Sequence, residues 1–74
     1  MNTVKQIGSP MAGLIDKLLV KEGQEVAAGD VLCVVSAMKM EVKVSAPRDG
    51  KIASVSIPAV GYRIVEGALL FTMK

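Results

Sequence analysis

The chain has 74 residues, 51% of them apolar, and its nine basic and seven acidic residues leave a formal net charge of +2. This length suits one small domain, and the scattered charges include no basic block that would indicate nucleic-acid or membrane-surface binding. Because histidine is absent and there is only one cysteine, the composition argues against a metal site, an autonomous enzyme and an intrachain disulfide, and it favours a reducing compartment.

The first half of the chain is predicted to form four strands, two of them very short. The predicted strands cover residues 4–7, 14–20, 25–27 and 31–37, and turns separate them. The alternation is imperfect in the second strand, where Ile15 and Leu18 have opposite parity. A bulge between these two residues would place both side chains on one face of the sheet. We therefore expect a bulged strand there.

The second half of the chain repeats the pattern of the first. The matching segments are residues 10–13 with 47–50, 15–20 with 52–57, and 31–35 with 69–73. After a one-residue insertion, the turn glycines also match, Gly23 with Gly61 and Gly29 with Gly67. Glycine supplies the positive φ that special turns require. The matched glycines therefore indicate two similar halves of four strands each.

Neither half could close a core alone, so the two halves should pack against each other. We predict an all-β fold, a flattened eight-strand barrel or sandwich with approximate two-fold symmetry. This symmetry would place a hairpin tip at residues 38–39 at one end of the molecule and the chain termini at the opposite end. Residues 1–74 are expected to form one domain, with residues 1–6 as a remnant of a linker.

The hairpin tip is predicted from the spacing of two strand-like runs, residues 31–37 and 40–45, which leave only Met38 and Lys39 between them. Two-residue hairpin turns favour Asn-Gly, Asp-Gly or Gly-X, because these residues tolerate positive φ. Met-Lys is a poor local choice for such a turn. This choice indicates that something other than folding selected these two residues.

Lys39 is the candidate functional residue. Methionine is adaptable and polarizable, so Met38 and Met40 suit a surface that several partners must contact. Met40 has a second interpretation, because it also begins an inward-facing set that continues with Val42 and Val44. Nothing in the neighbouring sequence would desolvate the Lys39 amine, which argues against a Schiff-base or general-base lysine. We interpret Lys39 as an attachment point on a rigid hairpin, made nucleophilic by another enzyme's site.

The other candidate residues are weaker. Glu41 and Lys43 should point outward, where they either contact partners or only solubilise the surface. Cys33 falls on the inward side of its strand and is expected to be a buried small hydrophobe. Six further carboxylates lie at turn-like or solvated positions and form no acid–base pair: Asp16, Glu22, Glu25, Asp30, Asp49 and Glu66. We expect no catalytic residue and no metal ligand in this chain.

Membrane and nucleic-acid functions are also disfavoured. No apolar run approaches the ~20 residues that cross a bilayer, and the polar start Met1-Asn2-Thr3 does not resemble a signal peptide. Only Tyr62 and Phe71 could stack on bases, which argues against an oligonucleotide-binding barrel. We expect an intracellular protein without membrane insertion.

The hairpin sequence Ala37-Met38-Lys39-Met40, followed by Glu41, resembles the attachment signature of the biotinyl domain. This domain is the carrier module of biotin-dependent carboxylases, decarboxylases and transcarboxylases. The resemblance extends from about Ile7 to the end of the chain. Further family-like elements at family spacing are residues 10–13, 20–23, 26–30 and 45–50.

The resemblance implies a flattened eight-strand barrel with biotin joined by an amide to Lys39, and a recognition motif formed by Ala37, Met38, Met40 and Glu41. It implies a biotin protein ligase as one partner, and biotin carboxylase and carboxyltransferase domains or subunits as the others. The segment Ser-Ala-Met-Lys-Met at residues 36–40 is most like the C-terminal carrier domain of pyruvate carboxylase, although related acyl-CoA carboxylases and decarboxylases have similar carriers. The family's compartments are the cytoplasm and the mitochondrial matrix.

Two features bear on subfamilies and rivals. The spacing from Gly13 to Gly29 leaves no room for the protruding thumb of some bacterial acetyl-CoA carboxylase carriers. A lipoyl carrier shares the fold, but its lysine typically follows Asp and precedes a small residue, whereas methionine flanks Lys39 on both sides. An unmodified barrel-like interaction module is the second alternative, and it would have no requirement for Met-Lys-Met.

Overall fold

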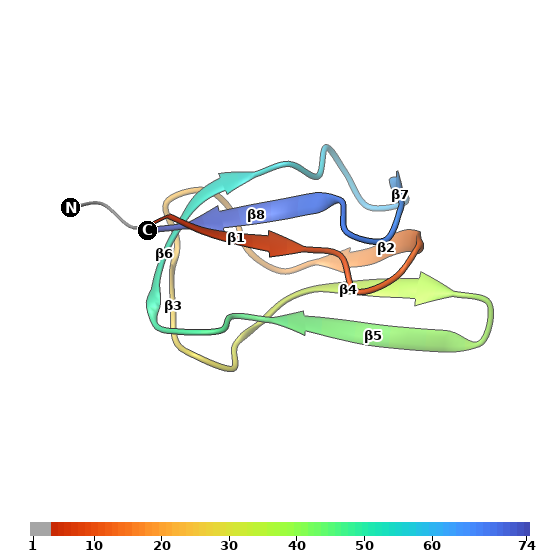
Figure 1. Cartoon of the computed structure of the whole chain (residues 1–74), viewed down its shortest axis with the longest axis horizontal. Helices are drawn as coiled ribbons and strands as arrows, with labels where there is room; N and C mark the ends of the chain where they lie inside the picture. The colour runs from red at the N-terminus through yellow and green to blue at the C-terminus, as the bar shows by residue number, and fades with distance from the viewer. Residues whose placement is uncertain (1–3) are drawn as a thin grey trace.

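The computed structural model describes residues 4–74, and in this range the chain forms eight antiparallel strands and no helix (Figure 1). The strands are β1 (Lys5–Gly8), β2 (Gly13–Leu18), β3 (Glu25–Val26), β4 (Val31–Ala37), β5 (Met40–Ser45), β6 (Gly50–Val55), β7 (Arg63–Ile64) and β8 (Leu69–Met73). The described residues contain no helical segment long and apolar enough to span a bilayer. The expected linker remnant at residues 1–6 lies partly outside the described residues.

The strands form two four-stranded sheets whose orders correspond one to one. The first sheet has the order β1-β8-β6-β3, and the second has the order β5-β4-β2-β7. Each strand of the first half therefore has a counterpart in the other sheet. For example, β6 is the counterpart of β2, and β8 is the counterpart of β4. The predicted all-β fold with two similar halves is confirmed. No protruding insertion separates β2 from β4, where the described chain holds only β3 and its turns.

Backbone hydrogen bonds at the predicted turns repeat in the two halves. The Gly23 amide donates to Ile52 over 2.8 Å, and the matching Gly61 amide donates to Ile15 over 2.7 Å. All four glycines that the repeat aligned have positive φ: Gly23 at 84°, Gly61 at 91°, Gly29 at 89° and Gly67 at 82°. Because L side chains rarely adopt these angles, the repeated glycines are explained by backbone geometry.

The bulge expected in the second strand is present. The register between β2 and β4 shifts between Ile15 and Lys17. Ile15 is consequently buried, and Leu18 packs against the core from a partly buried position. The regular strand ends at Leu18, two residues earlier than predicted, although the Leu19 amide still donates to the Leu32 carbonyl over 2.9 Å.

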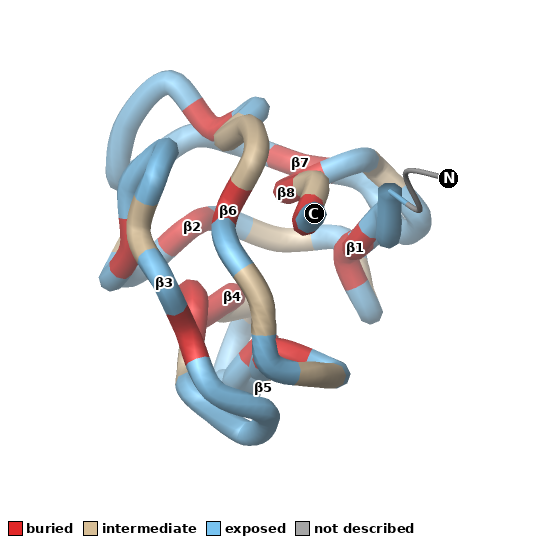
Figure 2. The backbone as a smooth tube through the Cα atoms, turned by 90° about the vertical axis from the view of Figure 1, so that its left-hand side faces the viewer, coloured by how far each residue is buried: buried red, intermediate tan, exposed pale blue. Residues whose placement is uncertain are grey.

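The core lies between the two sheets, and the view along the long axis shows buried positions on strands all around the molecule (Figure 2). Phe71 is the largest of the fully buried side chains. Cys33 is fully buried, as predicted, and so is Val35 two residues later, whereas Val31 is only half-buried. Leu32 is also buried, because a register shift between Val31 and Cys33 interrupts the alternation of β4.

The burial of Cys33 predicts a loss of stability at alkaline pH. Burial raises the pKa of the Cys33 thiol from 9.0 to about 11, because the thiolate is poorly solvated in the core. The unfolded chain therefore loses this proton first, so the thiol's contribution to stability is complete below pH 9.0 and is lost as the pH rises toward about 11. Urea unfolding of the parent and of Cys33→Ala should show a steeper fall for the parent across this range. Equal slopes would contradict the prediction.

Candidate attachment hairpin

The β4–β5 hairpin ends in a two-residue turn at one end of the molecule (Figure 1). Ala37 of β4 pairs with Met40 of β5, so Met38 and Lys39 alone form the turn, as predicted from the spacing. Met38 has a φ of 56° and is the only described non-glycine residue with positive φ. Hairpin turns usually give such a position to glycine or asparagine. The backbone thus confirms that Met-Lys is an unfavourable turn sequence.

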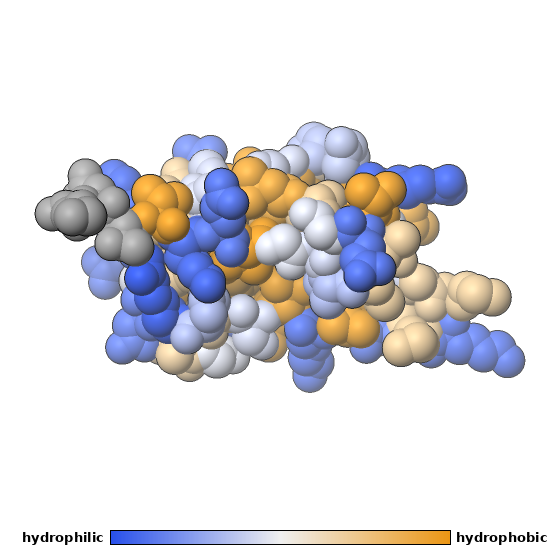
Figure 3. Space-filling view, in the orientation of Figure 1, coloured by the Kyte–Doolittle hydropathy of each residue, from blue (hydrophilic) through white to orange (hydrophobic). Residues whose placement is uncertain are grey.

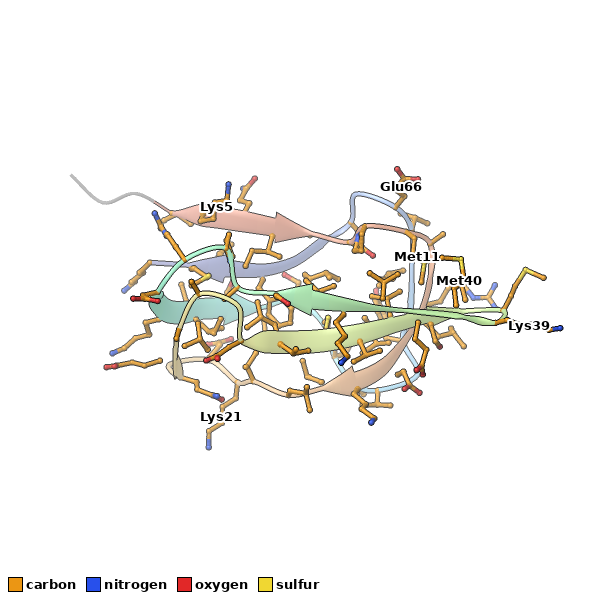
Figure 4. All side chains as sticks on the ribbon, turned by 90° about the horizontal axis from the view of Figure 1, so that it is seen from below. Lys5, Met11, Lys21, Lys39, Met40 and Glu66 are labelled. Carbon is orange, nitrogen blue, oxygen red and sulfur yellow. The ribbon has the colours of Figure 1, made fainter. Side chains whose placement is uncertain are left out.

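The side chains at the tip are presented to solvent. Lys39 points away from the body of the molecule at the very end of the hairpin (Figure 4). Met38 is fully exposed, at 104% of its reference area. In the space-filling view, moderately apolar atoms and hydrophilic side chains lie side by side at this end of the molecule (Figure 3). A large partner can therefore reach Lys39 without any rearrangement of the hairpin.

Met40 begins the expected set on one face of β5, but it is not buried as an inward-facing residue would be. Met40 is 62% exposed, whereas Val42 on the same side of β5 is half-buried and Val44 is buried. Alternation does place the three side chains on one face of the sheet. The hairpin, however, extends beyond the core, so most of the Met40 side chain remains in solvent. Glu41 and Lys43 are exposed, as predicted.

A close approach between β2 and β4 holds the base of the hairpin. A Cβ atom on Gly13 would lie 2.4 Å from the Ser36 carbonyl oxygen and 3.2 Å from a Val35 methyl carbon. Only glycine can occupy this position without displacing the backbone of β4. Because β4 pairs with β2 on one side and β5 on the other, the segment that leads to the tip is held by two strands.

An open groove lies beside the tip, between β2, β4 and β7. We call it the tip groove; its volume is about 560 Å³. Its main lining residues are Ala12, Leu14, Ala37, Met38, Arg63 and Val65. Sequence reasoning identified Ala37 and Met38 but missed the other four, because they are distant in sequence and meet only through strand pairing.

The remaining candidates from the sequence do not form a second site. The six carboxylates without a predicted role are all exposed: Asp16, Glu22, Glu25, Asp30, Asp49 and Glu66. Asp30 and Asp49 have structural partners, since they accept hydrogen bonds from the Ala27 and Ala28 amides over 2.9 and 2.7 Å. Among residues 4–74, no group of three or more His, Cys, Asp or Glu side chains could hold a metal ion.

Comparison with known families identifies the hairpin's context. A family model described as "Biotin-requiring enzyme", covering biotin and lipoyl domains, matches residues 5–73. The chain belongs to this family. It is 42% identical over 66 residues to the biotin carboxyl carrier protein of acetyl-CoA carboxylase from Solanum lycopersicum, an alignment covering 89% of this chain and 93% of the relative. The predicted function, a biotin carboxyl carrier domain with covalent biotin as its cofactor, is thereby confirmed over the lipoyl alternative.

Other relatives are much longer than this chain. Pyruvate carboxylase from Aspergillus niger is 46% identical over 52 residues, covering 70% of this chain and only 4% of the relative. The structure of urea carboxylase from Kluyveromyces lactis matches the whole chain with a TM-score of 0.87 and 26% identity, and this chain covers 6% of it. The chain thus spans only a small part of these two carboxylases. The shared fold agrees with the carrier interpretation.

Proposed function

We propose that Lys39 is the residue that carries biotin, and that biotinyl-Lys39 moves a carboxyl group between two separate active sites. The observation that carries this proposal is the position of Lys39 at a two-residue hairpin tip, with its side chain directed away from the body. In attachment, the Lys39 Nζ attacks the carbonyl carbon of biotinyl-adenylate. The amide C–N bond forms, the bond from that carbon to the AMP phosphate oxygen breaks, and the amine gives up a proton.

The role of the domain is then to tether and present biotin. Its exposed carboxylates form no acid–base site, so the bond-making steps belong to partner active sites. A covalent arm makes each visit to those sites intramolecular, and short flexible tethers raise the local concentration to roughly the mM range. We assign these sites to a biotin carboxylase and a carboxyltransferase, and the attachment step to a biotin protein ligase.

Residues beside Lys39 form the recognition motif in this proposal. Met38 and Met40 are both exposed at the tip and offer flexible, polarizable side chains to more than one partner. Ala37 is small, lies at the base of the turn opposite Met40, and leaves the approach to the tip open. Glu41 is exposed and supplies a charge on the outer side of the hairpin.

The identity of the complete enzyme is also part of the proposal. Similarity to pyruvate carboxylase supports a carrier for that class, and the 53% identity over 47 residues to the mitochondrial methylcrotonoyl-CoA carboxylase subunit alpha from Rattus norvegicus supports an acyl-CoA carboxylase equally well. We propose a biotin-dependent carboxylase in the cytoplasm or the mitochondrial matrix. Residues 1–74 would act in it as one carrier domain.

Mass spectrometry of the whole chain after incubation with biotin protein ligase, biotin and ATP tests the proposal. We expect one biotinyl adduct per chain, located at Lys39 by peptide mapping. An unmodified chain with an intact fold would contradict the proposal, as would an adduct on another lysine. A lipoyl adduct from a parallel incubation with lipoate ligase, without a biotinyl adduct, would indicate the related lipoyl carriers instead.

A further inference from the structure

One side of β5 is an open strand edge. Within residues 4–74, β5 pairs with β4 alone, and it is the last strand of its sheet. Figure 1 shows it along the lower side of the molecule, with no strand beyond it. Its pairing with β4 is regular from Met40 to Val44, and the register shifts only before Ser45. A regular open edge presents backbone donors and acceptors to which another strand can add.

The two-residue turn determines which backbone groups of β5 point outward. The residues that flank this turn, Ala37 and Met40, form a hydrogen-bonded pair. Hydrogen-bonded and non-hydrogen-bonded pairs alternate along an antiparallel ladder. Val42 is therefore bonded to β4, whereas the backbone amides and carbonyls of Glu41 and Lys43 point away from β4. These two residues carry the free hydrogen-bonding groups of the edge.

The counterpart edge, β1, is protected against pairing with another molecule. It has four residues, its register with β8 shifts between Ile7 and Gly8, and its only charged residue is Lys5. A short strand, a bulge and an edge lysine are the usual devices that prevent strand addition. β5 has six residues, and its Lys43 is balanced by Glu41 two residues earlier. Only β5 combines a regular backbone with opposite charges.

We propose that β5 pairs with β5 of a second copy of this chain, antiparallel and about a two-fold axis at Val42. In this register, Glu41 of each copy lies opposite Lys43 of the other. The same two residues carry the outward backbone groups, so each such pair exchanges both of its backbone hydrogen bonds. The backbone geometry and the side-chain charges thus favour the same alignment.

Charge selects this register over its neighbours. An axis at Glu41 would place the two Glu41 side chains opposite each other, and an axis at Lys43 would do the same with lysines. Opposite charges on facing residues stabilise paired strands, whereas like charges destabilise them. On the other face of the sheet, Met40 of one copy lies against Val44 of the other, and the two Val42 side chains meet. The exposed Met40 is covered by this contact.

The proposed dimer is weak and depends on concentration. One strand from each copy buries less than the roughly 1,200 Å² of stable interfaces, and we expect a dissociation constant on the order of 1 mM. Tethering two copies in one assembly would raise their local concentration into this range. The two hairpin tips point in opposite directions, and each Lys39 lies beside Ser45 of the other copy. Pairing therefore restricts access to Lys39 along one side of the hairpin.

Charge reversal tests the pairing in the unmodified chain. Translational diffusion measured by NMR up to about 2 mM should show a monomer–dimer equilibrium for the parent. Glu41→Lys places lysines opposite each other, and we expect the dissociation constant to rise at least tenfold. Glu41→Lys/Lys43→Glu again pairs opposite charges and should dimerise like the parent. The matched control Glu66→Lys makes the same change in net charge on the turn between β7 and β8, and it should also dimerise like the parent.

Disulfide formation tests the register. Val42→Cys places two thiols on the two-fold axis, across a non-hydrogen-bonded pair whose Cα atoms lie about 4.5 Å apart, which a disulfide can bridge. Met40→Cys is more exposed, but its two thiols would lie four residues apart along the paired strands, about 14 Å. With copper phenanthroline as the oxidant, we expect Val42→Cys to form covalent dimers at least tenfold faster. The native Cys33 is fully buried, so the parent gives the background rate.

Three results would overturn the proposal. The first is a parent that stays monomeric to about 2 mM. The second is a dimer that folded Glu41→Lys forms as well as the parent, because the contact then lies on another surface. The third is cross-linking of Met40→Cys as fast as that of Val42→Cys. If circular dichroism shows that Glu41→Lys is unfolded, Lys43→Glu makes the equivalent reversal. Neither experiment involves biotin, so this inference and the proposed function can fail separately.

Discussion

Replacing Lys39 with arginine is expected to abolish biotin attachment completely while leaving the fold unchanged. The guanidinium group keeps the positive charge and a similar length, but it stays protonated and cannot act as the attacking amine. Lys39 is exposed at the tip, so the substitution removes no core contact. Intact mass after prolonged incubation with ligase should show no adduct. Stoichiometric labelling of Lys39→Arg would prove that another of the chain's lysines is the acceptor.

The position of the amine should matter as much as its presence. In a chain with Met38→Lys and Lys39→Met, the tip keeps the same composition and an equally exposed lysine. The amine would project from the neighbouring turn residue, whose backbone has positive φ. Because misplacement of a reacting atom by about 1 Å can cost roughly 100-fold in rate, we expect ligation to fall by at least that factor. A ligation rate near that of the parent would show that the ligase recognises the residues of the tip but not the position of the amine.

The Gly13→Ala substitution is expected to destabilise the domain by about 3 kcal/mol, at the upper end of typical costs of overpacking. The added methyl group would lie 2.4 Å from the Ser36 carbonyl oxygen, which belongs to the backbone of a strand paired on both sides. A domain of this size has a total stability of roughly 4–11 kcal/mol. We therefore expect the thermal midpoint to fall by more than about 10 °C.

Gly8→Ala provides the matched control for this prediction. Gly8 also lies in a strand, but its nearest neighbour to an added Cβ is the Gly67 carbonyl oxygen at 3.3 Å, a tight but tolerable contact. We expect a loss of less than about 1 kcal/mol at this position. Similar thermal midpoints for the two alanine variants would mean that β2 can move away from β4 at little cost, and that the hairpin base is less rigid than described.

Features with a local backbone cause were predictable from the sequence. Gly23 and Gly61 were recognised as equivalent turn residues, and both have the positive φ that explains their type. The Met38-Lys39 turn followed from counting the residues between two strands. The bulge after Ile15 followed from the mismatch of parity with Leu18. In each case a few residues close together in the sequence determine the local backbone conformation.

Features that depend on what lies opposite a residue were not predictable. Alternation assigned Met40 to a face of β5, but it could not show that the core ends before that face reaches the tip. The tip groove was missed for the same reason, because Leu14 and Arg63 are far apart in sequence and meet only when β2 pairs with β7. Only the structure shows that these two residues lie side by side.

The pairing of β1 with β8 sets how far the biotin could travel. Lys5 pairs with Met73, so both ends of the folded region emerge together, at the end of the molecule away from Lys39 (Figure 1). A connecting segment joined to either end would act as a pivot, and the body of the domain would act as a rigid lever. A modest rotation about that pivot then sweeps the hairpin through an arc whose radius is the full length of the domain. Fusion of another protein to Lys74 should leave the swept space unobstructed.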